Sequence, residues 1–196
     1  MFTGIIENLG EIQSVKKEGS NVVFQLTSPI GKELKVDQSI AHDGVCLTVT
    51  KTDGNSHWVT AVDETLKRST LKSWKPGYLV NLERCMPSNG RFDGHIVQGH
   101  VDMMARVENI LEKEGSWEFL FSYGHTDEVL VDKGSVCVNG ISLTCFDTVA
   151  NSFRVAIIPY TFDHTNFKQL KVGDHVNLEF DIIGKYIQKI ISKRQA

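Results

Sequence analysis

The sequence uses one short segment twice, and this repeat constrains the fold more than any other feature. Residues 43–50 read Asp-Gly-Val-Cys-Leu-Thr-Val-Thr, and residues 139–144 read Asn-Gly-Ile-Ser-Leu-Thr. The glycines of the two copies, Gly44 and Gly140, lie 96 positions apart. Asp-Gly or Asn-Gly before an alternating run is typical of a tight β-hairpin, because a type I′ turn needs positive φ at both central residues. Each copy therefore predicts a hairpin.

Other segments match at the same offset. Val80-Asn81-Leu82-Glu83 recurs in full as Val176-Asn177-Leu178-Glu179, and Glu64-Thr65-Leu66 corresponds to Tyr160-Thr161-Phe162. A repeat of this length is too long for a solenoid unit and has the size of a small independent domain. The 196-residue chain is therefore expected to contain two domains that arose by internal duplication.

Composition excludes several classes of partner. Hydrophobic residues make up 41% and charged residues 23% of the chain, as in an ordinary globular protein. A net charge of −3 provides no basic field for nucleic acid or an anionic membrane. No apolar run approaches the ~20 residues of a membrane span, and the N-terminus lacks the pattern of a signal peptide. We therefore expect a cytoplasmic protein without a nucleic-acid or membrane partner.

The four cysteines, at positions 46, 85, 137 and 145, show no paired metal-ligand spacing. A reducing compartment disfavours disulfides, and three of the cysteines are expected to pack as small core residues. The sequence also lacks the motifs of nucleotide-phosphate sites and of the common hydrolases. No metal site is predicted.

Short, β-rich segments recur in both halves and predict an all-β protein. They are residues 22–26, 58–62, 79–82, 117–121, 153–157 and 175–180. Turn signals containing Gly, Asn or Asp separate them. Strands this short and this evenly spaced favour a closed barrel in each half, since closure removes exposed edges.

Three segments are expected to be helical. Residues 28–34 and 126–131 each predict one or two turns at equivalent places in the repeat. The C-terminal tail predicts an amphipathic helix, because its isoleucines at 183, 187, 190 and 191 fall on one face. This pattern alone leaves open whether that face packs on its own barrel or on a partner chain. Residues 87–94 are expected to link the halves.

Small polar residues alternate with leucine in both copies of the repeated strand. Cys46 and Thr48 share one face, and Ser142 and Thr144 share the equivalent face. These residues either line an ordinary solvated face or form two similar surfaces that bind similar ligands. The duplication favours the second interpretation, because two sites for the same kind of molecule need two similar surfaces.

Several other polar residues give weaker signals. His95 and His100 would lie on opposite faces of a strand, which argues against a shared metal ion, and a lone strand histidine is more often structural. Gly99 beside His100 would permit a close backbone approach to a ligand. Lys133 and Asp181 would ordinarily be solvated charges.

The motifs in combination resemble the riboflavin synthase family of the alpha-chain type. They are the N-terminal Met-Phe-Thr-Gly-Ile-Ile-Glu, the Asp-Gly-Val-Cys-Leu-Thr-Val segment, Val-Asn-Leu-Glu-Arg, Gly-His-Ile-Val-Gln-Gly-His-Val-Asp, Lys-Gly-Ser-Val-x-Val-Asn-Gly-Ile-Ser-Leu-Thr and Ile-Pro-x-Thr. The resemblance covers essentially the whole chain. It departs from the usual pattern only at Asp93, Phe162 and Phe167.

The resemblance implies two similar six-stranded Greek-key β-barrels, over residues 1–95 and 96–181, and a trimerisation helix over residues 182–196. It implies a homotrimer with the active site between subunits. The implied reaction is the dismutation of two molecules of 6,7-dimethyl-8-ribityllumazine. One donates a four-carbon unit to the other, which gives riboflavin and 5-amino-6-(ribitylamino)pyrimidinedione without a cofactor or metal. Association with a lumazine synthase capsid is left open.

Matching positions imply two lumazine sites. The first comprises Gly4, Ile5, Ile6, Cys46, Leu47, Thr48, Thr60, Ala61, Val62, Asp63, Glu64 and Thr65. The second comprises Gly99, His100, Val101, Ser142, Leu143, Thr144, Ile158, Pro159, Tyr160, Thr161, Phe162 and Asp163. Lys133 is expected to reach across a subunit interface, and Phe2 to close over a ring.

The resemblance also implies the catalytic residues Ser39, Cys46, His100, Ser142, Thr144 and Asp181. His100 and Thr144 are candidates for relaying the proton lost from a lumazine 7-methyl group. Ser142 and Asp181 are candidates for supplying or activating the nucleophile at C7 of the partner ring.

Two other functions are considered. Lumazine- and flavin-binding antenna proteins of luminous bacteria share the fold but lack much of the catalytic set, typically at the Cys46 position. The presence of Cys46, His100, Ser142 and Asp181 favours the enzyme. A flavin-reductase-like barrel is a weaker alternative, because the sequence shows no nicotinamide-binding domain.

Overall fold

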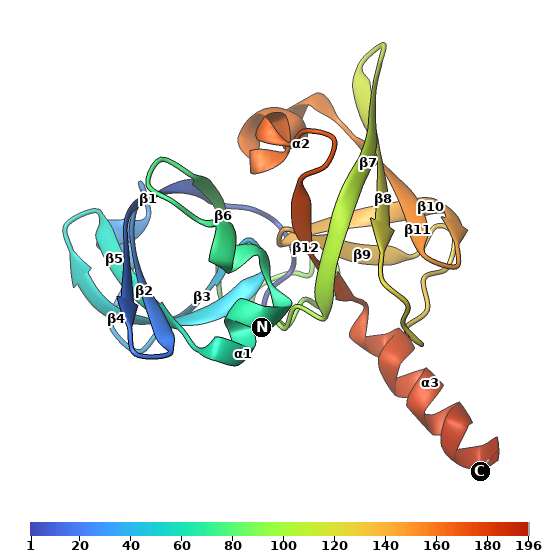
Figure 1. The fold of residues 1–196 in the computed structure, drawn as a ribbon, viewed down its shortest axis with the longest axis horizontal. Coiled ribbons are helices and arrows are strands. Elements are labelled where there is room, and N and C mark those ends of the chain that lie inside the picture. Colours follow the sequence, from blue (N-terminus) through green and yellow to red (C-terminus); the bar gives the residue numbers. More distant parts are fainter. Residues whose placement is uncertain (196) are drawn as a thin grey trace.

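The computed structural model describes residues 1–195 and contains two closed six-stranded barrels that lie side by side (Figure 1). Barrel 1 has the neighbour order β1-β2-β5-β4-β3-β6, and β6 pairs with β1 to close it. Its strands are β1 (Asn8–Glu18), β2 (Asn21–Thr27), β3 (Ser39–His42), β4 (Val45–Asp53), β5 (Ser56–Ala61) and β6 (Leu79–Arg84).

Barrel 2 repeats this topology strand for strand. Its neighbour order is β7-β8-β11-β10-β9-β12, closed by the pairing of β12 with β7. Its strands are β7 (Met103–Lys113), β8 (Ser116–Tyr123), β9 (Ser135–Val138), β10 (Ile141–Val149), β11 (Ser152–Ile157) and β12 (His175–Phe180). The prediction of an all-β protein with two similar six-stranded barrels is confirmed.

The repeated hairpin turns are present as predicted and touch each other. Asp43 and Gly44 have φ values of 46° and 77°, and Asn139 and Gly140 have 46° and 81°, which is the left-handed backbone of a type I′ turn. A Cβ on Gly44 would lie 2.8 Å from the Gly140 nitrogen. A Cβ on Gly140 would likewise lie 2.7 Å from the Gly44 nitrogen, so the duplicated turns pack against each other where the two barrels meet.

Each barrel has its own apolar core. That of barrel 1 is mainly aliphatic, whereas that of barrel 2 contains the buried rings of Phe119, Phe121, Phe153, Phe167 and Phe180. A third, smaller cluster of Phe2, Ala41, Val97 and Cys137 fills the seam between the barrels. The two halves thus have separate cores, and this apolar cluster is one part of the contact between them.

The short helices differ from the sequence prediction. Residues 28–34 contain one 3₁₀ turn, η1 (Gly31–Glu33), but the predicted helix at 126–131 is wrong. There the Thr126 hydroxyl accepts a hydrogen bond from the Glu128 amide, and the β-branched Val129 and Val131 disfavour a helical turn.

Two pairs of short helices were not predicted from the sequence. They are α1 (Asp63–Arg68) with η2 (Thr70–Ser73), and α2 (Pro159–His164) with η3 (Asn166–Gln169). Each pair follows the fifth strand of its barrel. Helices of six residues are too short to show a recognisable apolar period.

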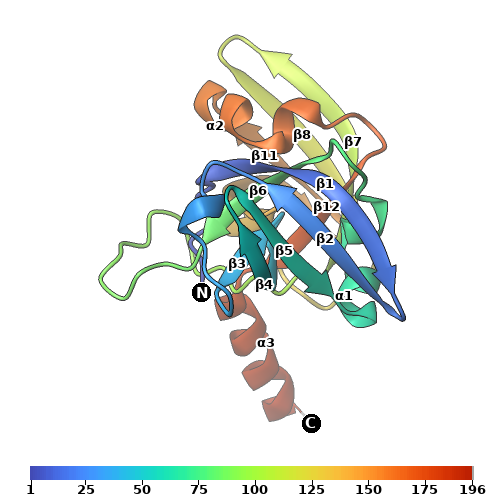
Figure 2. The same ribbon diagram turned by 90° about the vertical axis from the view of Figure 1, so that its left-hand side faces the viewer.

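The C-terminal helix α3 (Ile182–Gln195) projects away from both barrels (Figures 1 and 2). The Asp181 carboxylate accepts a hydrogen bond from the Ile183 amide at its first turn. Lys185 anchors its base through an ion pair with Asp102, at 2.6 Å. More than half of the surface of Ile183, Ile187, Ile190 and Ile191 is exposed. The apolar face therefore does not pack on its own barrel. Position 196 of the predicted helix lies outside the described residues.

The segments that precede the two barrels cross at the seam. The Phe2 amide donates to the Val97 carbonyl at 2.7 Å, and the Val97 amide donates to the Phe2 carbonyl at 3.1 Å. Beyond this bridge, Ile6 packs against the core of barrel 2, and Val101 packs against the core of barrel 1. Each barrel is therefore covered by a segment that precedes the other barrel in the sequence.

Candidate active site

Site 1 is a shallow pocket of about 160 Å³ on barrel 1. Its lining residues are Val45, Cys46, Glu64, Thr65, Arg68, Ser69, Gly99, His100 and Val101. The structure thus joins predicted first-site residues of β4 and α1 to a segment that was predicted to belong to the second site. That part of the prediction is wrong, because the crossing at the seam carries the Gly99 segment onto barrel 1.

The contact between Gly99 and Cys46 defines the floor of site 1. The Cys46 amide donates to the Gly99 carbonyl at 2.8 Å. Gly99 has a φ of +80°, and a Cβ there would lie 2.6 Å from the Cβ of Cys46. Only glycine allows the backbone to approach so closely in this conformation. Along β4, Leu47 is buried and Thr48 is exposed, so the predicted alternation is confirmed.

Site 2 is built in the same way on barrel 2. The Ser142 amide donates to the Gly4 carbonyl at 2.8 Å. Gly4 has a φ of +79°, and a Cβ there would lie 2.6 Å from the Cβ of Ser142. Gly4, Ile5 and Ile6 therefore belong with Ser142, and their predicted assignment to the first site is wrong for the same reason as that of Gly99.

A histidine that was not in the predicted catalytic set contacts Ser142. His95 Nδ1 lies 2.6 Å from the Ser142 hydroxyl oxygen. Burial lowers the pKa of His95, and the negative charge of Asp181 opposes this shift. The imidazole is therefore neutral near neutral pH and can accept the serine proton.

The sequence predicts a strand over residues 94–102, in which a lone histidine such as His95 is more often structural. In the structure this segment is irregular apart from the bridge at Val97. The glycine before His95 is a sequence feature that could have pointed to this contact. In the structure, a Cβ on Gly94 would lie 2.8 Å from the Cβ of Ser142. A sequence containing Gly-His twice, at 94–95 and 99–100, thus places both glycines against site residues.

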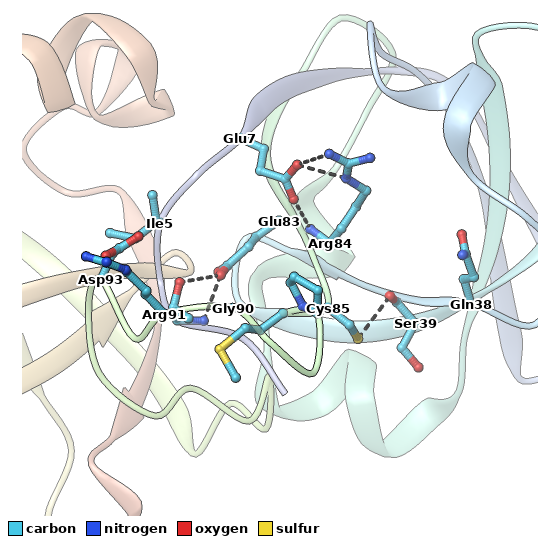
Figure 3. A pocket seen from close by; sticks show the side chains of 13 residues that line it. Ile5, Glu7, Gln38, Ser39, Glu83, Arg84, Cys85, Gly90, Arg91 and Asp93 are labelled. Atoms are coloured by element: carbon cyan, nitrogen blue, oxygen red, sulfur yellow. Dashed lines mark hydrogen bonds and ion pairs between the residues drawn. The ribbon is translucent and has the colours of Figure 1, made fainter.

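The predicted catalytic residue Ser39 lines a separate, larger pocket of about 630 Å³ between barrel 1 and the chain that follows β6 (Figure 3). The Cys85 thiol donates to the Ser39 carbonyl at 3.3 Å, and the ion pair of Glu7 with Arg84 forms one wall. Burial raises the pKa of the Cys46 thiol, and a hydrogen bond with the Ser39 side chain lowers it less. Cys46 is therefore a neutral thiol near neutral pH.

Phe2 does not have the predicted role. Its ring is fully buried in the seam, so it cannot close over a ligand ring on the surface of the chain. Its Cε2 atom would lie 3.0 Å from a Cβ on Gly99. Phe2 instead supports the Gly99 segment from behind.

The residues around α1 and α2 occupy equivalent places. Val62 and Ile158 are exposed immediately before the two helices, and Pro159 is the first residue of α2. Tyr160 is exposed and stacks on His164, whereas Phe162 stacks on Trp117 with the ring centroids 3.9 Å apart.

The remaining predicted site residues are placed as follows. Thr60 and Ala61 end β5, and Asp63 forms an ion pair with Lys67. Leu143 packs against the core of barrel 2, and Thr144 is exposed on β10. Backbone carbonyls of Thr161 and Asp163 accept hydrogen bonds from Thr165 and Lys168, and the ammonium of Lys133 lies 5.7 Å from the ring centroid of Phe146.

Residues 1–195 contain neither a metal-binding cluster nor a membrane-spanning helix. No group of three or more His, Cys, Asp or Glu side chains is arranged there to hold a metal ion. None of the helices in this part of the chain has the length and apolar character needed to cross a membrane.

Each half of the chain matches the same family model, described as the lumazine binding domain, over residues 3–85 and 98–181. The chain belongs to the lumazine binding domain family. The two matched copies of the lumazine binding domain contain β1–β6 and β7–β12, so the repeat in the sequence and the repeat in the structure coincide.

Similar proteins span the whole chain. The riboflavin synthase of Actinobacillus pleuropneumoniae is 42% identical and aligns with 100% of this chain and 92% of its own length. The riboflavin synthase of Bacillus subtilis is 40% identical and aligns with 98% of this chain and 91% of its own length. Among solved lumazine binding domain structures, LumP complexed with 6,7-dimethyl-8-(1'-D-ribityl) lumazine is 23% identical. It superposes with a TM-score of 0.83 over 91% of this chain and 98% of LumP, which shows a shared fold.

Proposed function

We propose that the chain is a riboflavin synthase, in which two molecules of 6,7-dimethyl-8-ribityllumazine react. One donates a four-carbon unit to the other, which gives riboflavin and 5-amino-6-(ribitylamino)pyrimidinedione. The observation that carries this proposal is the presence of two sites of one construction, each a polar strand face packed against a left-handed glycine. A reaction between two identical substrates needs two similar sites. Full-length similarity to riboflavin synthases supports the same conclusion.

Catalysis would arise first from holding the two rings together. Orienting two reactants can lower a barrier by roughly 7–11 kcal/mol. Site 1 encloses only about 160 Å³, whereas sites for small molecules usually enclose roughly 300–1,000 Å³. One chain therefore covers only part of a ligand. A homotrimer that places barrel 1 of one chain against barrel 2 of another would supply the remainder, and Lys133 would then act across the interface.

Proton transfer would involve a different residue in each site. In site 2, neutral His95 can take the proton of the Ser142 hydroxyl, which then supplies or activates a nucleophile for C7 of the bound ring. In site 1, the exposed His100 at the pocket is positioned to accept the proton of a 7-methyl group. Cys46 would contact the ligand as a neutral thiol, and Asp181 would act through His95.

Incubation of the purified protein with 6,7-dimethyl-8-ribityllumazine tests the proposal directly. Riboflavin absorbance is expected to appear without added metal or cofactor, with two lumazine molecules consumed for each riboflavin formed. Ser142→Ala protein serves as the matched control. Tight binding of the lumazine without turnover by the native protein would reject the enzyme and favour a binding protein.

A further inference from the structure

Two buried glutamates occupy equivalent positions in the repeat. Glu83 lies in β6 and Glu179 in β12, and they are 4% and 2% exposed. Within residues 1–195 neither carboxylate forms an ion pair with a basic side chain. A buried carboxylate is unfavourable unless several donors compensate it. Both glutamates must therefore be held by other groups.

The donors to Glu83 are in the N-terminal segment. Its carboxylate accepts from the Thr3 amide at 2.7 Å, the Thr3 hydroxyl at 2.9 Å and the Gly4 amide at 2.9 Å. Gly4 in turn gives its carbonyl to the Ser142 amide of site 2. Glu83 is a residue of barrel 1, yet it orients the backbone that packs on barrel 2.

Glu179 repeats this arrangement in the opposite direction. Its carboxylate accepts from the amides of Gln98, Gly99 and His100 at 2.7, 2.9 and 2.9 Å. Gly99 gives its carbonyl to the Cys46 amide of site 1. Glu179 is a residue of barrel 2, yet it orients the backbone that packs on barrel 1.

We infer that Glu83 and Glu179 are positioning residues, each for the ligand site on the opposite barrel. Glu179 sets the position of the Gly99 segment in site 1, and Glu83 sets the position of the Gly4 segment in site 2. The inference deepens the proposed function and rests on it, in that both sites are taken to bind lumazines or flavins. It also explains why the crossed segments keep their conformation although they lack regular secondary structure.

The crossed arrangement separates positioning from general structural support. Damage to packing would be felt mainly in the barrel that contains the substituted strand, because β12 pairs with β7 and β9, and β6 pairs with β1 and β3. A positioning role predicts the reverse. Loss of Glu179 should impair site 1 on the other barrel, and loss of Glu83 should impair site 2.

The test uses Glu179→Gln and Glu83→Gln, which keep the side-chain size but place an amide group against backbone N–H donors. Glu11→Gln, at an exposed position of β1, is the control. Riboflavin is the probe, and hydrogen exchange reports its protection of residues 45–48 and 141–144 separately. In Glu179→Gln, we expect riboflavin affinity measured at residues 45–48 to fall about tenfold, or about 1.4 kcal/mol, with little change at 141–144. Glu83→Gln should show the converse, and Glu11→Gln should match the native protein.

Equal loss at both sites, or loss confined to the barrel that carries the substitution, would overturn the inference. If riboflavin protects neither segment of the native protein, the proposed function fails instead. The positioning role is then decided by exchange without ligand: the Cys46 amide should exchange faster in Glu179→Gln, and the Ser142 amide faster in Glu83→Gln. Unchanged exchange of these two amides would overturn the inference independently of any ligand.

Discussion

The contact between Ser142 and His95 is the part of the molecule closest to conventional acid–base chemistry. A hydroxyl 2.6 Å from a neutral imidazole can be deprotonated as it attacks, provided that the imidazole is uncharged beforehand. Because burial keeps the pKa of His95 below its ordinary value, this condition holds near neutral pH. The pair thus gives site 2 an activated hydroxyl, whereas the equivalent Cys46 of site 1 remains a neutral thiol.

Replacement of Ser142 by Ala is expected to lower kcat by about 10²-fold or more, the usual contribution of such groups, with a smaller change in KM.

In the native protein kcat should fall as the pH drops through the lowered pKa of His95, below about 6.5, because protonated His95 cannot accept the serine proton. Rates of riboflavin formation against pH measure both effects. Ser152→Ala, outside the site, is the control. A native-like kcat in Ser142→Ala would remove the pair from the mechanism.

Barrel 1 contains a pair of histidines in its interior, away from both candidate sites. His42 and His57 are fully buried, with their Nε2 atoms 2.9 Å apart. His42 Nδ1 lies 3.1 Å from the Ile40 carbonyl and donates to it, so His57 Nε2 must donate to His42. The equivalent residues of barrel 2 are Val138 and Phe153, which are apolar. The pair is therefore a polar substitution within an otherwise apolar barrel interior.

This pair should make the protein less stable in acid. Burial lowers the pKa of His42 well below its ordinary value and that of His57 to about 4. The unfolded chain binds protons below about pH 6.5, whereas the folded pair does not, so the free energy of unfolding falls as the pH decreases from about 6.5 toward 4. The slope is about 1 kcal/mol per pH unit for each histidine.

The double variant His42→Val, His57→Phe copies the interior of barrel 2 and should remove this slope. Urea unfolding near pH 7 and near pH 4.5 measures the difference in stability for each protein. Subtracting the variant from the native protein isolates the pair from the buried carboxylates, whose raised pKa values act in the opposite direction. An identical pH dependence in both proteins would contradict the assignment.

At the scale of elements, the crossed glycine segments decide how each site is completed. Gly99→Ala would force a left-handed alanine and a 2.6 Å contact with Cys46, so both the backbone and site 1 must shift. Gly19→Ala is the matched control, because Gly19 has a φ of +63° but no atom within 4 Å of a Cβ. The control should lose only about 1–2 kcal/mol of stability. Gly99→Ala should lose more, and should also lose riboflavin binding at site 1. Urea unfolding and riboflavin titration measure the two effects, and equal losses in the two variants would contradict the close approach.

The sequence predicted the turns and strands well, but it did not predict that the segments preceding the two barrels cross. Asp43-Gly44 and Asn139-Gly140 specify their own turns, because only the local backbone decides a type I′ turn. The alternation around Leu47 likewise follows from strand geometry alone. These features, repeated at one offset, were sufficient to predict two barrels.

The grouping of the sites could not be predicted in this way. Position in the repeat assigns Gly4 to the first half and Gly99 to the second, but tertiary packing exchanges them. His95 was missed for a related reason: its segment contains enough β-branched and apolar residues to suggest a strand, while its conformation is set by Glu179 and by the bridge at Val97. Contacts between residues about 80 positions apart leave no periodic signal in the sequence.

At the scale of the whole molecule, a buried polar network fixes the barrels relative to each other. The Asn81 side chain donates to the Asn139 carbonyl at 2.9 Å, and the Asn177 side chain donates to the Asp43 carbonyl at 2.8 Å. Asn166 adds a bond to the Asp43 carboxylate. Because these groups are buried, loss of any partner would leave an unpaired polar group. The two candidate sites of one chain are thus linked through buried hydrogen bonds between the barrels.

Helix α3 is the element without a counterpart in the first half. It begins after Asp181, whereas the chain after the equivalent Cys85 continues into the linker. Its exposed isoleucines form an apolar face that a single chain leaves in water. In the proposed homotrimer this face packs on other chains and brings barrel 1 of one subunit to barrel 2 of the next.

Ile187→Lys should therefore dissociate the trimer, because it places a charge in the apolar face of α3 while leaving the Lys185–Asp102 anchor intact. Ser192→Lys adds the same charge on the opposite side of the helix and should leave the trimer unchanged. Sedimentation velocity measures the assembly, and riboflavin formation measures the completed active site. We expect Ile187→Lys to sediment as a monomer. At low protein concentration it should also lose at least about 90% of turnover, a tenfold loss that corresponds to about 1.4 kcal/mol. Each barrel should still bind riboflavin. An intact trimer in Ile187→Lys would contradict the role of α3 in assembly. Full turnover by a monomer would show that the second lumazine is not held by a neighbouring subunit.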